Sequence, residues 1–218
     1  MAETDTQTPC IEAQGLGLEW MLGSLYQGID VRIDPGQAVA VCGAADEARS
    51  ALLLTLAGRM KPTSGTLQIG GTSKIRLARA IDQVGLGPFS GVSDIPSEQR
   101  VFLIARTQMR ERHLPHSQAD IASYLHEWRL DATLRSYVGD LSPVELKTLG
   151  AALAFLGHPR AVVLEDVGRG ITHQDAIDLQ QRITDLAHRR GMAVVFGTAA
   201  LDLAKHADSA IYLPTEGN

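Results

Sequence analysis

The chain has 218 residues, of which 44% are hydrophobic and 21% charged, and its formal net charge is −5. This length allows one domain with a sizeable core, and the charge gives no reason to expect nucleic acid or an anionic membrane surface as the main partner. No apolar run reaches the about 18 residues that span a bilayer, and the first residues lack a signal-peptide pattern. Cys10 and Cys42 lie far apart, so we expect a cytoplasmic protein with reduced thiols.

The first 86 residues predict strands and turns around one helix. Residues 1–10 are polar and predict a flexible tail that includes Cys10. Apolar stretches that alternate with Gly and Ser over 11–33 indicate strands, and Asp34-Pro35-Gly36 is typical of a tight turn. The other elements expected here are a strand buried on both faces at 39–42, a helix over 50–59 that ends at Gly58, a short strand within 61–71 and a core strand over 80–86.

Residues 88–140 change character. They are polar, contain three prolines and show amphipathic patterns over 97–112 and 117–130, which predict a helical subdomain over about 88–145. The elements expected beyond it are a buried helix over 146–156, a strand at 161–164, a helix over 173–190 between a Thr172 cap and Gly191, a strand at 192–198, a helix at 201–208 and a strand at 209–214. Strands that alternate with helices predict one α/β domain over 11–218 with a parallel sheet.

The segment GAADEARS at 43–50 lies between the buried strand and the first helix, which is the place of a phosphate-binding P-loop. The P-loop pattern is GxxxxGK[ST], and here Ala48 and Arg49 replace its second Gly and its Lys. Glycines let backbone N–H groups approach a phosphate closely, and the Lys reaches the terminal phosphates. Asp46 and Glu47 add two carboxylates to the loop. Taken alone, the segment fits either an altered phosphate loop or a structural turn.

Two longer stretches resemble the ATP-binding domain of ABC transporters. The first, 141–167, is similar without a gap to the family's LSGGQ…P…DE segment through Leu141, Ser142, Pro159 and VVLED. The second, DPGQAVAVCGAADEARSALLLTLAGRMKPTSGTLQIGG, is similar to the family's P-loop region, and Pro62 to Gly65 match its PTSG quartet. The resemblance covers about 15–213. It implies an α/β fold with a P-loop NTPase (RecA-like) core and parallel sheet, an N-terminal antiparallel β-subdomain and an inserted helical subdomain.

The resemblance also implies roles for single positions. These are a site for ATP with Mg²⁺ formed by Gly43, Ala48, Arg49 and Ser50, adenine stacking by Trp20, Mg²⁺ ligation by Ser50 and Glu165, and a catalytic carboxylate at Asp166. Trp20 fits a packing role equally well. The implied partners are a membrane permease subunit, a second ABC-type ATPase domain, or both, and no nucleic acid.

Several positions depart from the family pattern. The family's Asp-Glu pair is reversed as Glu165-Asp166, and its Gly-Gly-Gln is Pro143-Val144-Glu145, which removes an N–H and adds bulk and negative charge. Pro143 after Ser142 is instead a good helix start. The switch His falls on Ala199, and the family's Gln falls near Leu86 or Gly87. Phosphoryl transfer needs positioned positive and dipolar groups at the γ-phosphate, so these changes together predict a loss of hydrolysis.

The sequence therefore predicts a degenerate ABC-type subunit without ATP hydrolysis, with ATP and Mg²⁺ binding in doubt. Its expected role is structural or regulatory, as the partner of a membrane permease or of a competent ATPase, and its expected place is the cytoplasm or the inner face of the cell membrane. Two alternatives stay open. One is a slow or conditional ATPase that energises a transporter, and the other is a cytosolic protein-binding module unconnected to transport.

Overall fold

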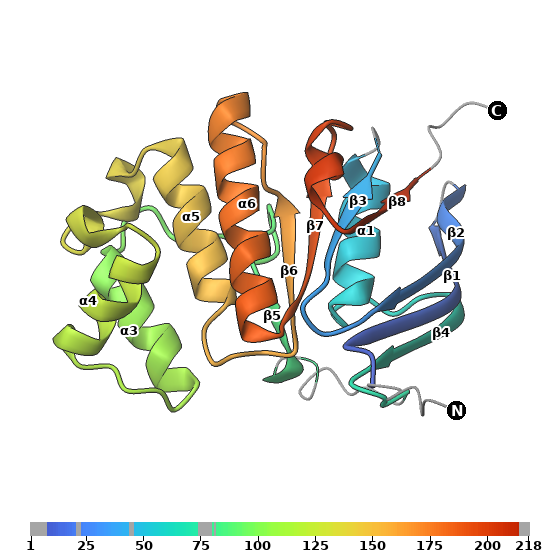
Figure 1. Cartoon of the computed structure of the whole chain (residues 1–218), viewed down its shortest axis with the longest axis horizontal. Helices are drawn as coiled ribbons and strands as arrows, with labels where there is room; N and C mark the ends of the chain where they lie inside the picture. The colour runs from blue at the N-terminus through green and yellow to red at the C-terminus, as the bar shows by residue number, and fades with distance from the viewer. Residues whose placement is uncertain (1–7, 21–22, 44–45, 74–79, 81, 214–218) are drawn as a thin grey trace, which may run out of the picture.

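The computed structural model describes residues 8–20, 23–43, 46–73, 80 and 82–213, except for the side chain of residue 46. Two sheets lie side by side (Figure 1). The parallel sheet has the order β5-β6-β7-β3-β8, and the antiparallel sheet has the order β2-β1-β4. The strands are β1 (Ile11–Trp20), β2 (Gly23–Ile33), β3 (Ala38–Cys42), β4 (Ser64–Ile69), β5 (Val84–Leu86), β6 (Ala161–Asp166), β7 (Ala193–Thr198) and β8 (Ser209–Tyr212).

The helices lie on both faces of the parallel sheet. They are α1 (Asp46–Leu56), α3 (Val101–Glu111), α4 (Gln118–Glu127), α5 (Pro143–Ala154) and α6 (His173–Arg190), with short 3₁₀ helices η1 (Asp131–Thr133), η2 (Val138–Asp140) and η3 (Leu203–His206). Figure 1 shows α1 between the two sheets, α5 and α6 on the other side of the parallel sheet, and α3 and α4 farthest from the antiparallel sheet. Among the described helices, none combines the length and the apolar character needed to cross a membrane.

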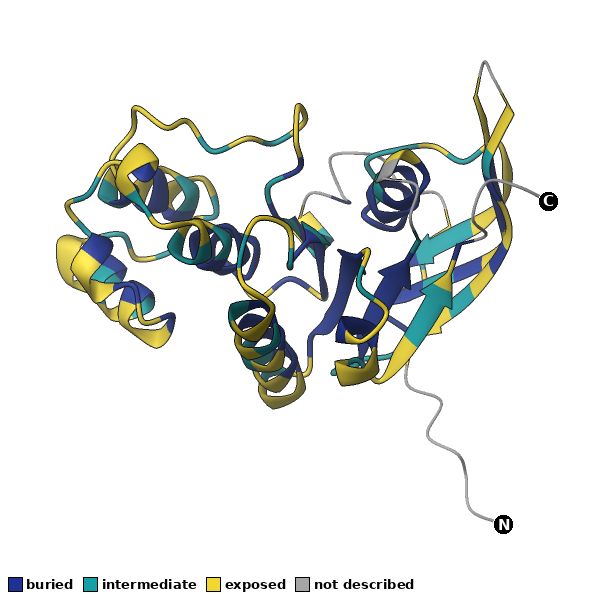
Figure 2. Cartoon of the chain, turned by 90° about the horizontal axis from the view of Figure 1, so that it is seen from above, coloured by how far each residue is buried: buried dark blue, intermediate teal, exposed yellow. Residues whose placement is uncertain are grey.

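The inner parallel strands β3, β6 and β7 are buried on both faces (Figure 2), which explains their apolar runs, whereas the edge strand β8 is partly exposed. In β3, Ala38, Ala40 and Cys42 pack into the core beneath α5 and α6. Val39 and Val41 pack into a second core with α1 and the antiparallel sheet. Because successive strand residues point to opposite faces, one apolar run serves two cores. This arrangement confirms the predicted α/β fold with a parallel sheet.

Local signals set the start of α5 and both ends of α6. Compared with the predicted ranges 146–156 and 50–59, α5 (Pro143–Ala154) and α1 (Asp46–Leu56) begin and end earlier. α5 begins with a capping box in which Ser142 caps the helix and Glu145 reaches back, with Pro143 in the first turn. The Oγ of Thr172 accepts the N–H of Asp175 at the start of α6, and Gly191 ends that helix in the left-handed region with φ 62°. The helical patterns over 97–112 and 117–130 correspond to α3 and α4.

Some boundaries differ from the prediction. Cys10 is 3% exposed and joins two strand ends, because its N–H donates to Ile33 O and its carbonyl accepts from Gly70 N, so it does not belong to a free tail. Residues 1–7 lie outside the described part. The strand expected over 80–86 begins only at Val84, since residues 80, 82 and 83 are helical. The helix expected at 201–208 is the short η3. The division into subdomains stays a prediction.

Both cysteines are free and buried. Burial raises the pKa of the Cys10 and Cys42 thiols above the usual value. Cys42 is 1% exposed at the end of β3, as its place in an apolar run predicts. Both thiols therefore act as small core side chains.

Candidate functional site

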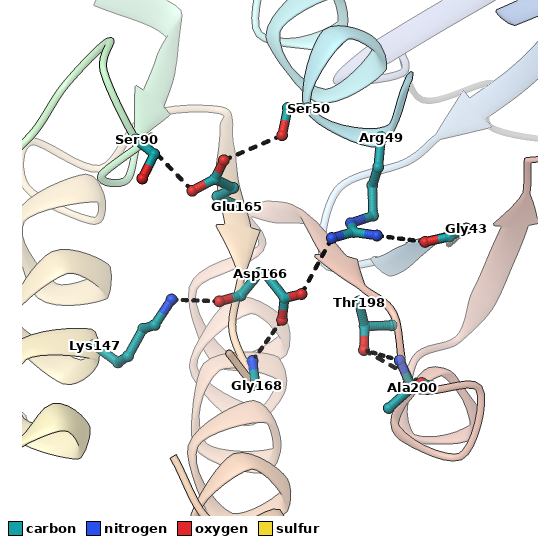
Figure 3. A network of polar contacts seen from close by, with 10 residues as sticks. All are labelled: Gly43, Arg49, Ser50, Ser90, Lys147, Glu165, Asp166, Gly168, Thr198 and Ala200. Atoms are coloured by element: carbon teal, nitrogen blue, oxygen red, sulfur yellow. Dashed lines mark hydrogen bonds and ion pairs between the residues drawn. The ribbon is translucent and has the colours of Figure 1, made fainter. Parts of the chain in front are cut away.

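The candidate site lies where the carboxyl ends of β3, β7 and β6 meet the first turns of α1 (Figure 3). Gly43 follows β3, Thr198 ends β7, and Glu165 and Asp166 end β6. In a parallel sheet the carboxyl ends of all strands share one edge, and ligands bind in the crevice outside that edge. The fold thus brings together the described residues of the predicted phosphate loop and the acidic pair.

Arg49 points into the protein. Its side chain is 1% exposed, and its guanidinium donates to the carbonyl of Gly43 and, over 3.2 Å, to Oδ2 of Asp166. Both contacts are visible in Figure 3. A charge is buried at acceptable cost only when it is paired and hydrogen-bonded, and Asp166, whose side chain is 8% exposed, supplies that pair. The residue in the place of the P-loop Lys is therefore bound to the protein itself.

Gly197 in β7 makes this position of Arg49 sterically feasible. It lies between Val41 of β3 and Asp166 of β6 in the sheet. A Cβ at Gly197 would lie 3.2 Å from Cδ of Arg49 and 2.9 Å from Cδ1 of Leu53. The absence of a side chain there leaves the space that the arginine stem fills across β7. Sequence reasoning missed this residue, although a lone Gly inside a buried strand is a signal of close approach.

Asp166 has further partners besides Arg49. Its Oδ1 accepts the N–H of Gly168 over 3.0 Å, and its backbone carbonyl accepts from Nζ of Lys147 on α5. Both carboxylate oxygens are thus occupied within the protein. Each oxygen keeps a second lone pair, but the carboxylate is 8% exposed and paired with Arg49, so water reaches it only if this arrangement opens. The catalytic role of Asp166 stays a prediction.

Ser50 and Glu165, the two predicted magnesium ligands, do lie together. Oγ of Ser50 donates to Oε1 of Glu165 over 3.1 Å, and Oε2 of Glu165 accepts the N–H of Ser90 over 3.3 Å. A hydroxyl beside a carboxylate suits the oxygen preference of Mg²⁺. In the described part of the chain no group of three His, Cys, Asp or Glu side chains could hold a metal ion, so a cation here needs ligands from water or a phosphate.

The remaining residues of the predicted nucleotide site differ in their exposure, and some lie outside the described part of the chain. Ala48 is 6% exposed, whereas Glu47 is exposed on the first turns of α1. Residues 44 and 45 and the side chain of Asp46 lie outside the described part of the chain. Trp20 ends β1 and is 63% exposed, so its ring is open to a ligand or partner and is not a packing residue.

The polar groups of the segment 142–145 hydrogen-bond to one another. Oε2 of Glu145 accepts from the N–H of Ser142 over 2.8 Å and from its Oγ over 2.6 Å. These hydrogen bonds from Ser142 hold the pKa of the Glu145 carboxyl below its usual value. The N-terminus of α5 thus binds its own carboxylate, which competes with any external anion. At 199 the side chain is an exposed methyl, and the Thr198 Oγ1 accepts the N–H of Ala200 to close the turn.

The donor set fits a magnesium ion better than it fits a nucleotide phosphate. Ser50 and Glu165 offer oxygen ligands next to each other. The only guanidinium of the predicted phosphate loop is buried and bonded to Gly43 and Asp166. Because the Arg49 side chain is 1% exposed, a phosphate could reach it only after the side chain leaves this position. This geometry does not place a cation where a transferring phosphoryl group would need one.

No protein-family model matches the chain. The chain is 26% identical over 196 residues to a putative ABC transporter ATP-binding protein of Streptomyces coelicolor, covering 87% of this chain and 33% of that protein. It is 29% identical over 202 residues to the energy-coupling factor transporter ATP-binding protein EcfA2 of Lactiplantibacillus plantarum, covering 85% and 66%. It is 26% identical over 204 residues to the lipoprotein-releasing system ATP-binding protein LolD 1 of Rhodospirillum rubrum, covering 87% of each. The chain thus spans a third to two thirds of the first two relatives.

Solved structures share the fold. A dimeric ATP-binding cassette in a post-hydrolysis state, bound to ADP and Pi, matches 93% of this chain and 94% of its own, with a TM-score of 0.79 and 14% identity. CbiO1 from Clostridium perfringens, described as part of the ABC transporter complex CbiONQ, matches 95% and 85%, with a TM-score of 0.75 and 16% identity. These likenesses confirm the P-loop NTPase fold that the sequence resemblance implies.

Proposed function

We propose, from the premise that this chain belongs to the ABC-transporter ATP-binding family, that it is a degenerate member which does not hydrolyse ATP. It acts as a structural or regulatory subunit, in contact with a membrane permease, with a second ABC-type ATPase domain, or with both. It is a cytoplasmic protein held at the inner face of the membrane by these contacts. The relatives named above are transporter and release-system ATP-binding proteins, which supports a membrane partner.

One observation carries this proposal: the predicted phosphate-binding cation and the predicted catalytic carboxylate neutralise each other. Arg49 and Asp166 form an ion pair of 3.2 Å in which neither side chain is more than 8% exposed. Removing one partner of a buried pair costs about 3–5 kcal/mol, because the other charge stays buried and unpaired. A nucleotide that recruits Arg49 must first overcome a penalty of this kind. The same contact holds the predicted base against a cation in a buried position, away from water.

The permease contact in this proposal is a groove between the loop after β5 and the helices α3 and α5. Its volume is about 400 Å³, and its walls include Ile95, Ile104, Leu153 and Gly150 beside the exposed Thr107. An apolar groove with a polar rim suits a short amphipathic helix of another protein. A second ATPase domain is supported by the dimeric state of the cassette with the shared fold.

Co-purification from native membranes tests the partner. Wild-type protein with an affinity tag is recovered after mild detergent extraction, beside Thr107→Arg in the groove and Leu103→Arg on the exposed side of α3 outside it. We expect a permease to be recovered with the wild type and Leu103→Arg but not with Thr107→Arg. Recovery of no permease and no ATPase with the wild type, or equal recovery of a permease with both variants, contradicts the proposal.

A second function has one observation in its favour. The contact between Ser50 and Glu165 keeps two oxygen ligands together, so the chain is alternatively a conditional Mg-ATP-binding subunit. Thermal unfolding with Mg-ATP, and with ATP and EDTA, separates the two. A magnesium-dependent rise in melting temperature that Ser50→Ala removes and Ser90→Ala keeps supports the second function, because Glu165 contacts Ser90 only through the backbone. No shift at millimolar Mg-ATP rules it out.

A further inference from the structure

A second pocket, partly open to solvent, lies beside the end of β6, on the side away from Arg49. Its volume is about 210 Å³, and it is bounded by α5, α6 and the loop that follows β5. Its walls are largely apolar and include Pro88, Ile95, Leu146, Leu164, Leu179 and Ile183. Its polar lining comes from Ser90, Asp94, Lys147, Glu165 and Asp166. Figure 3 shows Lys147 and Arg49 on opposite sides of Asp166.

Among the residues that the structure describes, Lys147 is the only lysine that lines this cavity. It is partly buried on α5, and its Nζ donates to the backbone carbonyl of Asp166. Within the described part of the chain no carboxylate forms an ion pair with it, so its hydrogen-bond partner is a neutral group. An ammonium in this position loses water without gaining a paired charge.

The surroundings of the amine favour its neutral form. Burial lowers the pKa of Lys147, and the charge of Arg169 lowers it further. Asp166 and Glu165 act in the opposite direction without reversing the shift. Asp94 also lines the cavity, while α6 contributes Leu179 and Ile183, which carry no charge. A neutral lysine amine in an apolar pocket is a nucleophile, whereas an ammonium is not.

We propose that Lys147 is a nucleophilic lysine and that its cavity accepts a small apolar aldehyde or ketone, which the amine captures as an imine. The Nζ lone pair forms a bond to the carbonyl carbon, and the carbonyl π electrons move to oxygen. Proton transfer from nitrogen to oxygen gives the carbinolamine. Loss of its oxygen as water then forms the C=N bond, so the balance is amine plus carbonyl compound giving imine plus water. This reaction needs no nucleotide.

The cavity restricts the ligand by size and by charge. A cavity of about 150 Å³ is enough to hold benzene, so 210 Å³ accommodates an aldehyde such as benzaldehyde. Asp94 and Glu165 repel an anionic aldehyde, while the apolar walls favour a hydrocarbon body. The exposed lysines select an aldehyde neither by its size nor by its charge.

Reductive trapping tests the proposal on the intact chain. The sequence has four lysines, at 61, 74, 147 and 205, so mass spectrometry resolves each site. Lys61 and Lys205 are exposed and serve as internal references. With benzaldehyde and sodium cyanoborohydride at pH 7, we expect Lys147 to be modified more than tenfold faster than either reference. An equal or slower rate at Lys147 overturns the proposal.

Two controls separate nucleophilicity from simple access. The rate advantage is expected to shrink above about pH 10, where exposed lysines also lose their protons, and an advantage that does not change with pH contradicts the proposal. Glyoxylate, an anionic aldehyde, is expected to show no preference for Lys147. A preference as large as that for benzaldehyde contradicts the charge argument.

A cavity-filling variant tests the location. Leu146→Phe places a ring in the cavity and is expected to slow trapping at Lys147 at least fivefold, with the rates at Lys61 and Lys205 unchanged. Leu103→Phe, on α3 outside the cavity, is the matched control and keeps the wild-type rate. If a folded Leu146→Phe protein traps at the wild-type rate, the reaction does not take place in this cavity.

Discussion

Two cationic side chains approach Asp166 from opposite sides, and the fold treats them differently (Figure 3). Arg49 is 1% exposed and pairs with the carboxylate, whereas Lys147 donates to the backbone carbonyl and lines a cavity. A buried cation with a charged partner stays charged and fixed. A partly buried amine with a neutral partner loses part of its preference for the charged form. Asp166 thus pairs its carboxylate with Arg49, which stays fixed, and offers only its backbone carbonyl to Lys147, whose amine remains available for reaction.

The largest loss of stability is expected from variants that break the ion pair between Arg49 and Asp166. Arg49→Met leaves the Asp166 carboxylate buried without its charged partner, and Asp166→Asn does the same to the guanidinium. Each is expected to lower the free energy of unfolding by about 3–5 kcal/mol, measured by urea denaturation. Glu165→Gln is the matched control, because Glu165 is only partly buried and bonds to neutral donors.

The double variant sharpens this result. Arg49→Met with Asp166→Asn removes both charges, so its loss is expected to be well below the sum of the two single losses. Additive losses contradict a direct ion pair.

Gly197→Ala tests the space that Arg49 occupies. The new methyl lies within 3.2 Å of Cδ of Arg49 and 2.9 Å of Leu53, so we expect a loss of about 1–3 kcal/mol in urea denaturation. In the Arg49→Met background the loss is expected to be smaller, since the flexible thioether side chain can move aside. A loss that is unchanged in that background assigns the crowding to Leu53 and to the backbone oxygen of Glu165, which would lie 3.2 Å from the new methyl.

The N-terminal cap of α5, the helix that carries Lys147, makes the free energy of unfolding depend on pH. Ser142→Ala removes a capping hydroxyl and is expected to cost about 1 kcal/mol at pH 7. Hydrogen bonds from Ser142 hold the folded-state pKa of Glu145 below its unfolded value, so this stabilisation is present above about pH 4.3 and is lost as the pH falls through the folded pKa. The gap between wild type and variant in urea titrations should narrow in that acidic range. A gap that is constant down to pH 3 contradicts this linkage.

The equivalent N-terminal cap of α4 provides a control at a helix outside the Lys147 cavity. Ser117 and Asp120 form the same capping box on α4, which carries no residue of the Lys147 cavity. Ser117→Ala is expected to leave the trapping rate of Lys147 at the wild-type value. A change in that rate would show that Lys147 responds to general loosening of the helices.

The smallest effect on stability is expected on the Lys147 side itself. Lys147→Met keeps the apolar stem and removes one hydrogen bond to a carbonyl, so the free energy of unfolding should change by no more than about 1 kcal/mol. Urea denaturation beside Arg49→Met measures the contrast directly. A loss as large as that of Arg49→Met removes the distinction between the two cations.

The framework was predictable because its signals are local or periodic. Thr172 and Gly191 mark the ends of α6 through cap chemistry, and the run 38–42 shows by its apolar residues alone that β3 is buried on both faces. The length of the short strand at 84–86 was overestimated because residues 80, 82 and 83, just before it, are helical. Periodicity does not distinguish a short buried strand from the end of a helix.

The sequence predicts which residues form the site but not the directions in which their side chains point. The resemblance places Gly43, Arg49 and Asp166 in one site, and the structure does bring them together. The direction of the Arg49 side chain depends on Gly197, which is distant in the sequence and supplies only an absence of atoms. The orientation of Lys147 likewise depends on the carbonyl of a strand that α5 meets only after folding. Such contacts follow from tertiary packing and not from local pattern.

Phosphate release from Mg-ATP is the measurement that tests the central claim most directly. Wild-type protein and Ser50→Ala are assayed together at millimolar Mg-ATP, because the variant removes the remaining hydroxyl ligand while keeping the Arg49–Asp166 pair. The account predicts that the wild type releases no more phosphate than the variant. Release by the wild type that clearly exceeds that of Ser50→Ala shows that Arg49 and Asp166 leave each other to act on ATP, and contradicts the account.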